Sequence, residues 1–485
     1  MLQKGVQAHT SVGLSGASND ARGTVRPEAS STTPSPASAE AAAAAVVEGA
    51  APVAGADPAA VAPGADDAEA VAADDTAVAA EPDVPPADSD AGLPQAAAVS
   101  RAAVTRATGR PNSDMPVRLG SAASLSAGMM PPVTDRPPTL DELDTATLRT
   151  LLGVADGPQL VGVRSEPLGA ATGFLGELRR LHLTWDPPGD GVGTPTSLVA
   201  KAPTTDPGGR SVGLLLDVWA REHRFFAELA PRCSTRVPSC HANLADPGSG
   251  RWLLLLGDAG DTTAAAQSDG AGVDHAVAAL AEIATLHRDF AGGRPVPWLA
   301  GFDRGPLEAL QTAVCSAVEP FLDRFGPLLP EGTDTLLRRF APRLAEWTAA
   351  MARGPLTVVH ADYRLDNLVI DPAGQVTVLD WQTTLVGPAA MDVASFLATS
   401  LTVADRRAWE EDLFAAYADV AGSTVDAVRN GVRHHLLWWM ALYANNLSRL
   451  EPDDPRAVAM LHSTVQRTFT AAVDHDCAGL LERRW

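Results

Sequence analysis

The chain has 485 residues and a formal net charge of −22 at pH 7. An acidic chain without a basic stripe does not suit nucleic acid or an anionic membrane surface as a partner, so both classes of function are disfavoured. Its four cysteines are scattered and form no C-x-x-C pair, which favours a reduced, cytoplasmic protein over a disulfide framework or a zinc site. No stretch approaches the roughly 20 apolar residues that cross a bilayer, and no apolar core of a secretory signal follows the first residues.

Residues 1–135 differ in composition from the rest of the chain. Ala, Pro, Asp, Gly, Ser and Thr dominate, and no Trp, Phe or Tyr occurs among them. Such a stretch cannot bury enough apolar surface to offset the entropy of ordering it, so we expect a disordered tail. Because Met130 lies close to where globular character begins, the tail is either a disordered extension or an over-long start assignment. We expect the folded part to divide into a smaller lobe at 136–258 and a larger lobe at 259–485.

The first predicted elements are a helix and a glycine-rich hairpin. The stretch 139–152 has a Thr N-cap and acidic residues in its first turn, which predicts a helix. Alternation of apolar and polar residues predicts a hairpin within 168–185, with Gly173 and Gly176 near its tip. Glycines there would let backbone N–H groups approach phosphate oxygens, although most glycine-rich hairpin tips are only turns.

A single lysine, Lys201, interrupts the short apolar strand predicted at 197–203. A lysine in a buried strand is costly unless its ammonium group meets a negative partner, whereas an edge lysine can simply cover apolar surface with its stem. Apolar residues at helical spacing predict a helix at 218–229, and Glu222 on that helix could reach Lys201.

Arg251 and the continuous apolar run that follows it to Leu256 predict a buried strand that ends at Gly257-Asp258. A glycine-rich hairpin, a strand lysine, a helix glutamate and a buried strand, in that order, match the nucleotide-binding lobe of kinases. Lys201 would then hold the α- and β-phosphates, and the helix glutamate would hold Lys201. The backbone around Leu256 and Asp258 would form the hinge against the adenine edge.

The strongest pattern is H-x-D-x-x-x-x-N between two apolar strands, followed by a strand that ends in an aspartate. Phosphoryl transfer needs positioning and charge neutralisation more than covalent chemistry. Asp362 fits the carboxylate that orients an acceptor hydroxyl and takes its proton. Asn367 and Asp380 supply the hard oxygen ligands that Mg²⁺ prefers. We expect His360 to be a hydrogen-bonding strut, and we count Arg364 among the catalytic candidates of the same segment.

The run H-A-D-Y-R-L-D-N-L, with L-D-W-Q after it, closely resembles the aminoglycoside phosphotransferase superfamily, which also contains choline kinases. Its form looks most like the ecdysteroid-kinase-like and related bacterial branches. The resemblance covers roughly residues 140–480 and is tightest at 356–396. It implies an α+β, protein-kinase-like two-lobed fold that uses ATP and Mg²⁺. By the same resemblance Asp362 is the catalytic base, Asn367 and Asp380 bind the metal, and Lys201 binds phosphate.

Three departures from related patterns narrow the prediction. Trp381-Gln382 replaces the Phe-Gly of protein kinases, so we expect no activation-loop switch and disfavour protein-kinase activity. Gly257-Asp258 stands where relatives commonly carry an acidic pair, which leaves GTP open beside ATP. The hairpin tip is not G-x-G-x-x-G. Asp392, in the stretch after the metal aspartate, is expected to be structural and to lie near the catalytic loop.

Helices are predicted at 274–290, 406–421, 428–450 and 455–474. The first should support the catalytic loop. The third carries Trp438 and Tyr443, which either line an acceptor pocket for a bulky alcohol or belong to the core. The acidic run Glu410-Glu411-Asp412 could attract a cationic substrate, but a solvated helix face explains it better.

These patterns predict an ATP-dependent kinase that phosphorylates a hydroxyl of a small molecule, such as a metabolic or sterol-like alcohol. An aminoglycoside antibiotic kinase is the alternative within the enzyme class, since the acidic charge suits a cationic substrate. A nucleotide-binding pseudokinase or scaffold is the alternative of another class. Degenerate kinases usually lose the Asp, Asn or Lys position, and this sequence retains all three.

Overall fold

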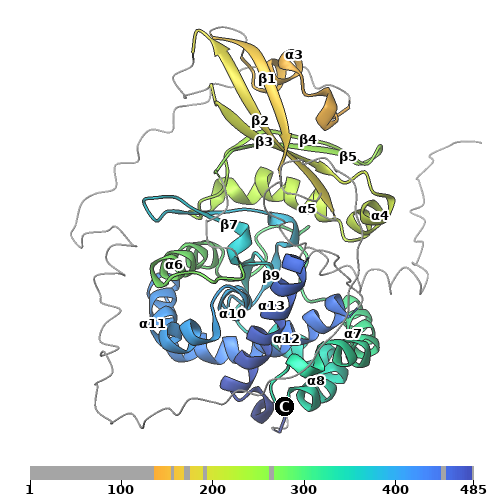
Figure 1. The fold of residues 1–485 in the computed structure, drawn as a ribbon, viewed down its shortest axis with the longest axis vertical. Helices are drawn as coiled ribbons and strands as arrows, with labels where there is room; N and C mark the ends of the chain where they lie inside the picture. Colours follow the sequence, from red (N-terminus) through yellow and green to blue (C-terminus); the bar gives the residue numbers. More distant parts are fainter. Residues whose placement is uncertain are drawn as a thin grey trace, which may run out of the picture.

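The computed structural model describes residues 136–154, 158–168, 175–188, 194–260, 267–448 and 455–482. The predicted disordered tail and Gly173 lie outside these residues. The described chain forms a β-sheet lobe and a larger, mainly helical lobe (Figure 1). The predicted two-lobed α+β fold class is therefore confirmed. Among the helices described, none is long and apolar enough to cross a membrane.

The smaller lobe is built on one five-stranded antiparallel sheet with the strand order β1-β2-β3-β5-β4. Its strands are β1 (Gln159–Pro167), β2 (Gly176–Asp186), β3 (Ser197–Pro203), β4 (Cys240–Asp246) and β5 (Arg251–Gly257). Successive side chains of a strand point to opposite faces. One face buries Leu181, Leu198 and Leu255 in the lobe's own core. The other face carries Leu254, which packs in the core cluster of the larger lobe.

The helix predicted at 139–152 is interrupted. A short 3-10 turn, Leu140–Glu142, comes first, and a capping box joins Thr139 to Glu142. Helix α3 (Thr145–Leu151) then begins anew, because the Asp144 side chain accepts a hydrogen bond from the amide of Thr147 at 2.8 Å. A side chain that binds the backbone in this way favours a new N-cap over a continued helix.

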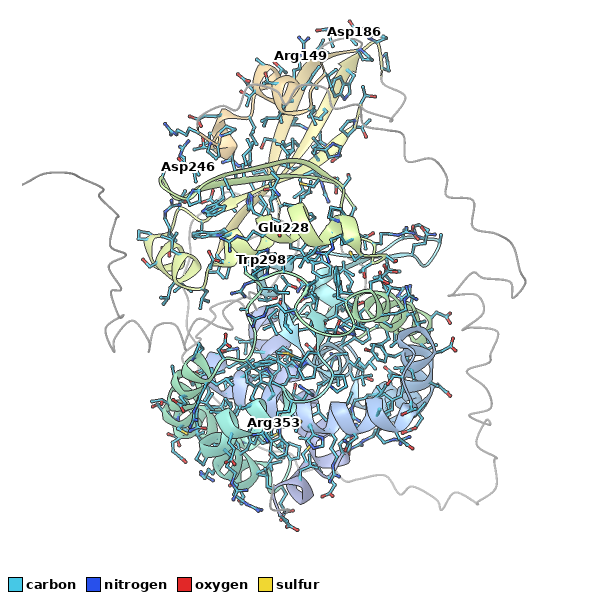
Figure 2. The ribbon with its side chains drawn as sticks, turned by 180° about the vertical axis from the view of Figure 1, so that it is seen from behind. Arg149, Asp186, Glu228, Asp246, Trp298 and Arg353 are labelled. Atoms are coloured by element: carbon cyan, nitrogen blue, oxygen red, sulfur yellow. The ribbon has the colours of Figure 1, made fainter. Side chains whose placement is uncertain are left out.

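Two helices connect β3 to β4. Helix α4 (Pro207–Leu215) was not predicted, whereas α5 (Val218–Arg224) lies in the predicted helix and continues as a π-helical turn, Phe225–Leu229. Helix α5 lies between the sheet and the larger lobe (Figure 1). The guanidinium group of Arg224 stacks 5.8 Å above the ring of Trp298, which lies near the junction of the lobes (Figure 2).

The larger lobe packs its helices around the buried helix α12. The helices described are α6 (Val273–Asp289), α7 (Arg304–Phe325), α8 (Thr333–Phe340), α9 (Leu344–Met351), α10 (Ala390–Thr399), α11 (Val403–Ala421), α12 (Val425–Leu447), α13 (Pro455–Asp474) and α14 (Cys477–Leu480). The four predicted helices correspond to α6, α11, α12 and α13. Two short antiparallel pairs carry the catalytic segment: β6 (Thr357–Val359) with β9 (Leu385–Gly387), and β7 (Leu368–Ile370) with β8 (Val376–Val378).

Candidate active site

The loop between β6 and β7 is fixed through its backbone by one buried carboxylate on α10. The amides of His360 and Ala361 donate to Asp392 at 2.7 and 2.8 Å. Ala361 has a φ of +64°, a conformation that residues other than Gly, Asn and Asp rarely adopt. The two hydrogen bonds therefore hold the loop in a backbone conformation that it would not prefer by itself. Asp392 lies beside the catalytic loop, where a structural residue was predicted.

Helix α6 packs against the same loop and against Asp392. His287 on α6 contacts Asp392 with its Nε2 at 3.0 Å and the hydroxyl of Tyr417 with its Nδ1 at 2.7 Å. The hydroxyl of Tyr363, within the loop, donates to the carbonyl of Ala279 at 2.6 Å. These groups are buried, so each polar atom needs the partner that the others supply. The predicted supporting role of this helix agrees with these contacts.

His360 joins the catalytic loop to the strand that precedes Asp380. Its Nε2 lies 2.8 Å from the carbonyl of Leu379, and its Nδ1 accepts from the amide of Asp362 at 3.2 Å. With both ring nitrogens engaged by the backbone, His360 has the environment of a strut and not that of a proton acceptor for a substrate.

Asp362 lies between an amide and a guanidinium group. Its Oδ2 accepts from Asn367 Nδ2 at 2.9 Å, and its Oδ1 lies 3.2 Å from Arg364 Nε. Arg364 also binds Asp366 at 2.8 Å, so one cation serves two carboxylates. Burial raises the pKa of Asp362, and the neighbouring Arg364 opposes that rise. The carboxylate is thus a stronger proton acceptor than an exposed aspartate.

Lys201 joins the two lobes. Its Nζ lies 2.8 Å from a carboxylate oxygen of Glu222 on α5 and 2.8 Å from Oδ1 of Asp380 in the larger lobe. Burial alone would lower the pKa of Lys201, but the two carboxylates raise it on balance, so the lysine stays charged. Burial raises the pKa of Glu222. For Asp380 the attraction of Lys201 outweighs burial and lowers its pKa.

The segment after Asp380 is fixed against α5. The amide of Trp381 donates to Glu222 at 3.2 Å, and the fully buried Trp381 ring stacks on Phe225 with centroids 3.9 Å apart and planes 7° apart. Asp380 itself has a φ of +57°, a left-handed conformation that Asp tolerates better than most residues. That the segment does not flip as the Phe-Gly loop of protein kinases does stays a prediction, which rests on Gln382 in place of the glycine.

Asn367 and Asp380 present the oxygen atoms that a magnesium ion requires. Asn367 donates with its Nδ2 to Asp362, and its amide oxygen has no partner among the described residues. Among these residues no three His, Cys, Asp or Glu side chains form a metal-binding group. Mg²⁺ is usually held by one or two protein oxygens together with water and phosphate oxygens, and this donor set fits that mode.

The predicted hinge residues have different environments. Leu256 lies inside the sheet, opposite Val199 on one side and Cys240 on the other. The carboxylate of Asp258 is occupied by Arg180 and Ser197. The backbone that can face a nucleotide base therefore lies after Leu256, at the residues that follow β5.

Gly176 begins β2 and lies over the stem of Lys201. A Cβ at this position would lie 3.7 Å from Cε of Lys201 and 3.4 Å from the carbonyl oxygen of Ala202. Of the two predicted glycine contacts, only Gly176 falls within the described residues. The structure also brings the predicted residues Lys201, Glu222 and Asp380 together.

Three residues with clear contacts at the site were not assigned a role from the sequence: Arg180, Ser197 and Asp366. Asp366 belongs to the quoted motif, and its spacing from Arg364 could have suggested the ion pair. Arg180 and Ser197 lie on the same face of the sheet as Lys201, which the alternation of β2 and β3 indicates once the strand order is known.

A strand lysine paired with a helix glutamate, opposite an aspartate and an asparagine on a fixed loop, is the arrangement of kinase-like phosphotransferases. Residues 213–429 match the model of the phosphotransferase enzyme family. The resemblance predicted from the catalytic segment is thereby confirmed. No curated protein matches the chain.

Several solved structures resemble this chain at low identity. A microcompartment-associated aminopropanol kinase is 14% identical, with 66% of this chain and 94% of that chain covered and a TM-score of 0.40. A choline/ethanolamine kinase family protein from Mesorhizobium loti is 17% identical, with 70% and 94% covered and a TM-score of 0.37. The aminoglycoside phosphotransferase APH(3'')-Id from Streptomyces rimosus, solved with ADP and streptomycin, is 20% identical, with 62% and 98% covered and a TM-score of 0.36. Identities this low assign no substrate.

Proposed function

We propose that this protein transfers the γ-phosphate of ATP, with Mg²⁺, to a hydroxyl group of a small molecule. The observation that carries the proposal is the contact of Lys201 with both Glu222 and Asp380. That contact joins the predicted phosphate-binding lysine of one lobe to a predicted metal ligand of the other.

The residues then have distinct roles in the transfer. Asp362 orients the acceptor hydroxyl and takes its proton as the bond from that oxygen to the γ-phosphorus forms and the bond to the β–γ bridging oxygen breaks. Lys201 holds the phosphates, and Asn367 with Asp380 would hold the Mg²⁺ that neutralises them. Arg364 lies beside Asp362 and adds a fixed positive charge where the transferred group carries negative charge.

The aromatic residues of α12 are the feature that favours a neutral, partly apolar alcohol as the acceptor. Tyr443 of α12 lies close enough to Asp362 for the carboxylate to raise its pKa further than burial alone does, so it keeps its phenolic proton. Trp438 on the same helix is buried edge-on against Phe302, with ring centroids 5.4 Å apart. Trp438 and Tyr443 are both buried in the core of the larger lobe, and Tyr443 is the one whose hydroxyl is influenced by Asp362.

Two of the three acidic residues that could have attracted a polycationic antibiotic are already paired. Glu410 binds Arg406 and His475, and Glu411 binds Arg429. These pairs argue against the aminoglycoside alternative at this helix. The pseudokinase alternative is disfavoured because the lysine, the catalytic aspartate and both candidate metal ligands are positioned together.

The test is transfer of radiolabelled γ-phosphate from ATP into a metabolite extract, with the product identified by mass. We expect a phosphorylated alcohol with the wild-type protein and a loss of about 10³-fold or more in turnover with Asp362→Ala. Asp412→Ala, which removes an exposed aspartate of α11, is the matched control and should keep wild-type turnover. Equal turnover in Asp362→Ala and the wild type would reject the mechanism.

A further inference from the structure

We propose that Arg180 and Ser197 hold the carboxylate of Asp258 away from the nucleotide base and thereby select adenine over guanine. This inference rests on the proposed function, since it concerns the nucleotide of that reaction. It assigns a specificity role to two residues that were given no role from the sequence.

The sheet places these residues on the face that carries Lys201. Arg180 of β2 lies opposite Val199 of β3, and Val199 lies opposite Leu256 of β5. Ser197 is two residues before Val199 and Asp258 is two residues after Leu256, so period-2 alternation puts all of these side chains on one face. Lys201 occupies the same face two residues beyond Val199. A nucleotide with its phosphates at Lys201 therefore extends its base toward Arg180 and Asp258.

Four contacts, three of them hydrogen bonds, surround the Asp258 carboxylate. Arg180 Nε lies 2.9 Å from Oδ2, and an Arg180 Nη nitrogen lies 3.5 Å from Oδ1. The hydroxyl of Ser197 donates to Oδ2, and the amide of Gly260 donates to Oδ1 at 3.0 Å. An ionised carboxylate offers about four acceptor positions; three of them accept hydrogen bonds, and the Arg180 guanidinium group, whose Nε makes an ion-pair contact without a hydrogen bond, lies against the carboxylate as well. These donors also keep the pKa of Asp258 below its ordinary value although burial alone would raise it, so the group is ionised and cannot donate.

The two purines need different partners at a hinge. The six-position of adenine carries an amino donor, whereas guanine carries an acceptor there and adds donors at N1 and at the two-amino group. A free carboxylate would pair with those two guanine donors. With the carboxylate occupied and a guanidinium group beside it, guanine would leave its donors unpaired, and unpaired buried donors reduce affinity. Adenine, by contrast, can find its hydrogen-bond partners in the backbone N–H and C=O groups of the hinge.

The experiment compares Arg180→Met with Arg179→Met. Arg179 is the neighbouring residue of β2 and pairs with the exposed Asp141, so its variant removes the same charge on the other face of the strand. Binding is measured by displacement of a fluorescent N-methylanthraniloyl-ATP with ATP and with GTP, and kcat/KM is measured for Mg²⁺-dependent hydrolysis of each nucleotide. We expect the wild type and Arg179→Met to prefer ATP. Arg180→Met should raise the GTP-to-ATP ratio by about 10-fold, the effect of one hydrogen bond to a charged group.

The double variant Arg180→Met/Asp258→Asn should lose that gain, because the amide lacks the second acceptor oxygen. An unchanged ratio in a folded Arg180→Met protein, or a wild type that uses both nucleotides equally, would overturn the inference and leave the phosphotransferase proposal intact. If neither nucleotide binds to the wild type, the proposed function itself is wrong. Should Arg180→Met not fold, Ser197→Ala frees the same carboxylate oxygen and carries the same expectation with a smaller rise.

Discussion

The catalytic loop and the nucleotide-binding lobe are held in place by different kinds of interaction. In the loop, buried hydrogen bonds to backbone amides fix the chain itself, with Asp392 as the common acceptor. In the other lobe, Lys201 is positioned by side-chain charges, one of which belongs to the opposite lobe. The loop geometry is thus set within one lobe, whereas the lysine site depends on how the two lobes meet.

This difference predicts how substitutions in each region change the stability and the activity of the protein. Where a buried carboxylate holds the backbone, removing that carboxylate should lower both the stability and the activity of the protein, because the amides then have no other partner. Any substitution of a lysine that is held by charges should lower the activity of the protein. The accompanying loss of stability should be recovered when one of the opposing carboxylates is removed as well.

The largest effect on stability is expected at Asp392. Asp392→Ala leaves two loop amides and one nitrogen of His287 without their acceptor, and should lower the free energy of unfolding by about 3–5 kcal/mol, as measured by urea denaturation. Because Ala361 would no longer be held at positive φ, kcat should fall by about 100-fold or more. Asp392→Asn keeps one acceptor oxygen, so its free energy of unfolding and its kcat should lie between those of the wild type and Asp392→Ala. Wild-type stability in Asp392→Ala would show that the loop is not held through this residue.

The next effect is expected at Lys201. Lys201→Met leaves the buried Glu222 and Asp380 without their cation, so we expect a loss of about 3 kcal/mol in unfolding free energy and of about 100-fold in kcat/KM for ATP. The double variant Lys201→Met/Glu222→Gln should recover most of the stability, since one uncompensated carboxylate is gone, but none of the activity. Recovery of activity in the double variant would contradict the assignment of Lys201 to the phosphates.

The catalytic segment could be predicted from the sequence because its chemistry is local. His360, Asp362 and Asn367 lie within eight residues, and their spacing alone sets which groups can meet. Helices α12 and α13 could be predicted because their apolar residues recur at helical spacing. Helix α4 could not, since three glycines and a proline give Pro207–Leu215 a weak propensity. It is stabilised by a tertiary contact: the Trp219 ring packs against Gly213, in the space that a side chain at that position would need.

Contacts between distant strands and helices could not be predicted for a different reason. Arg180 and Asp258 are 78 residues apart and meet only because β3 lies between β2 and β5 in the sheet. His287 and Asp392 are 105 residues apart and meet through the packing of α6 below the loop. In both cases the residue types were visible in the sequence, but the strand order and the helix packing that bring them together were not.

The smallest effect is expected at Gly176, where the predicted phosphate contact depends on a missing side chain. Gly176 has no positive φ, and an added Cβ would make ordinary van der Waals contacts with Lys201 and Ala202. Gly176→Ala should therefore change the free energy of unfolding by less than about 0.5 kcal/mol. If the glycine serves only to begin β2, the KM for ATP should stay within about twofold of the wild type; if its amide approaches a phosphate, the Cβ should raise KM by about 10-fold while kcat changes little. Steady-state kinetics of Gly176→Ala beside Lys201→Met separates a glycine that admits the phosphate from one that only begins a strand.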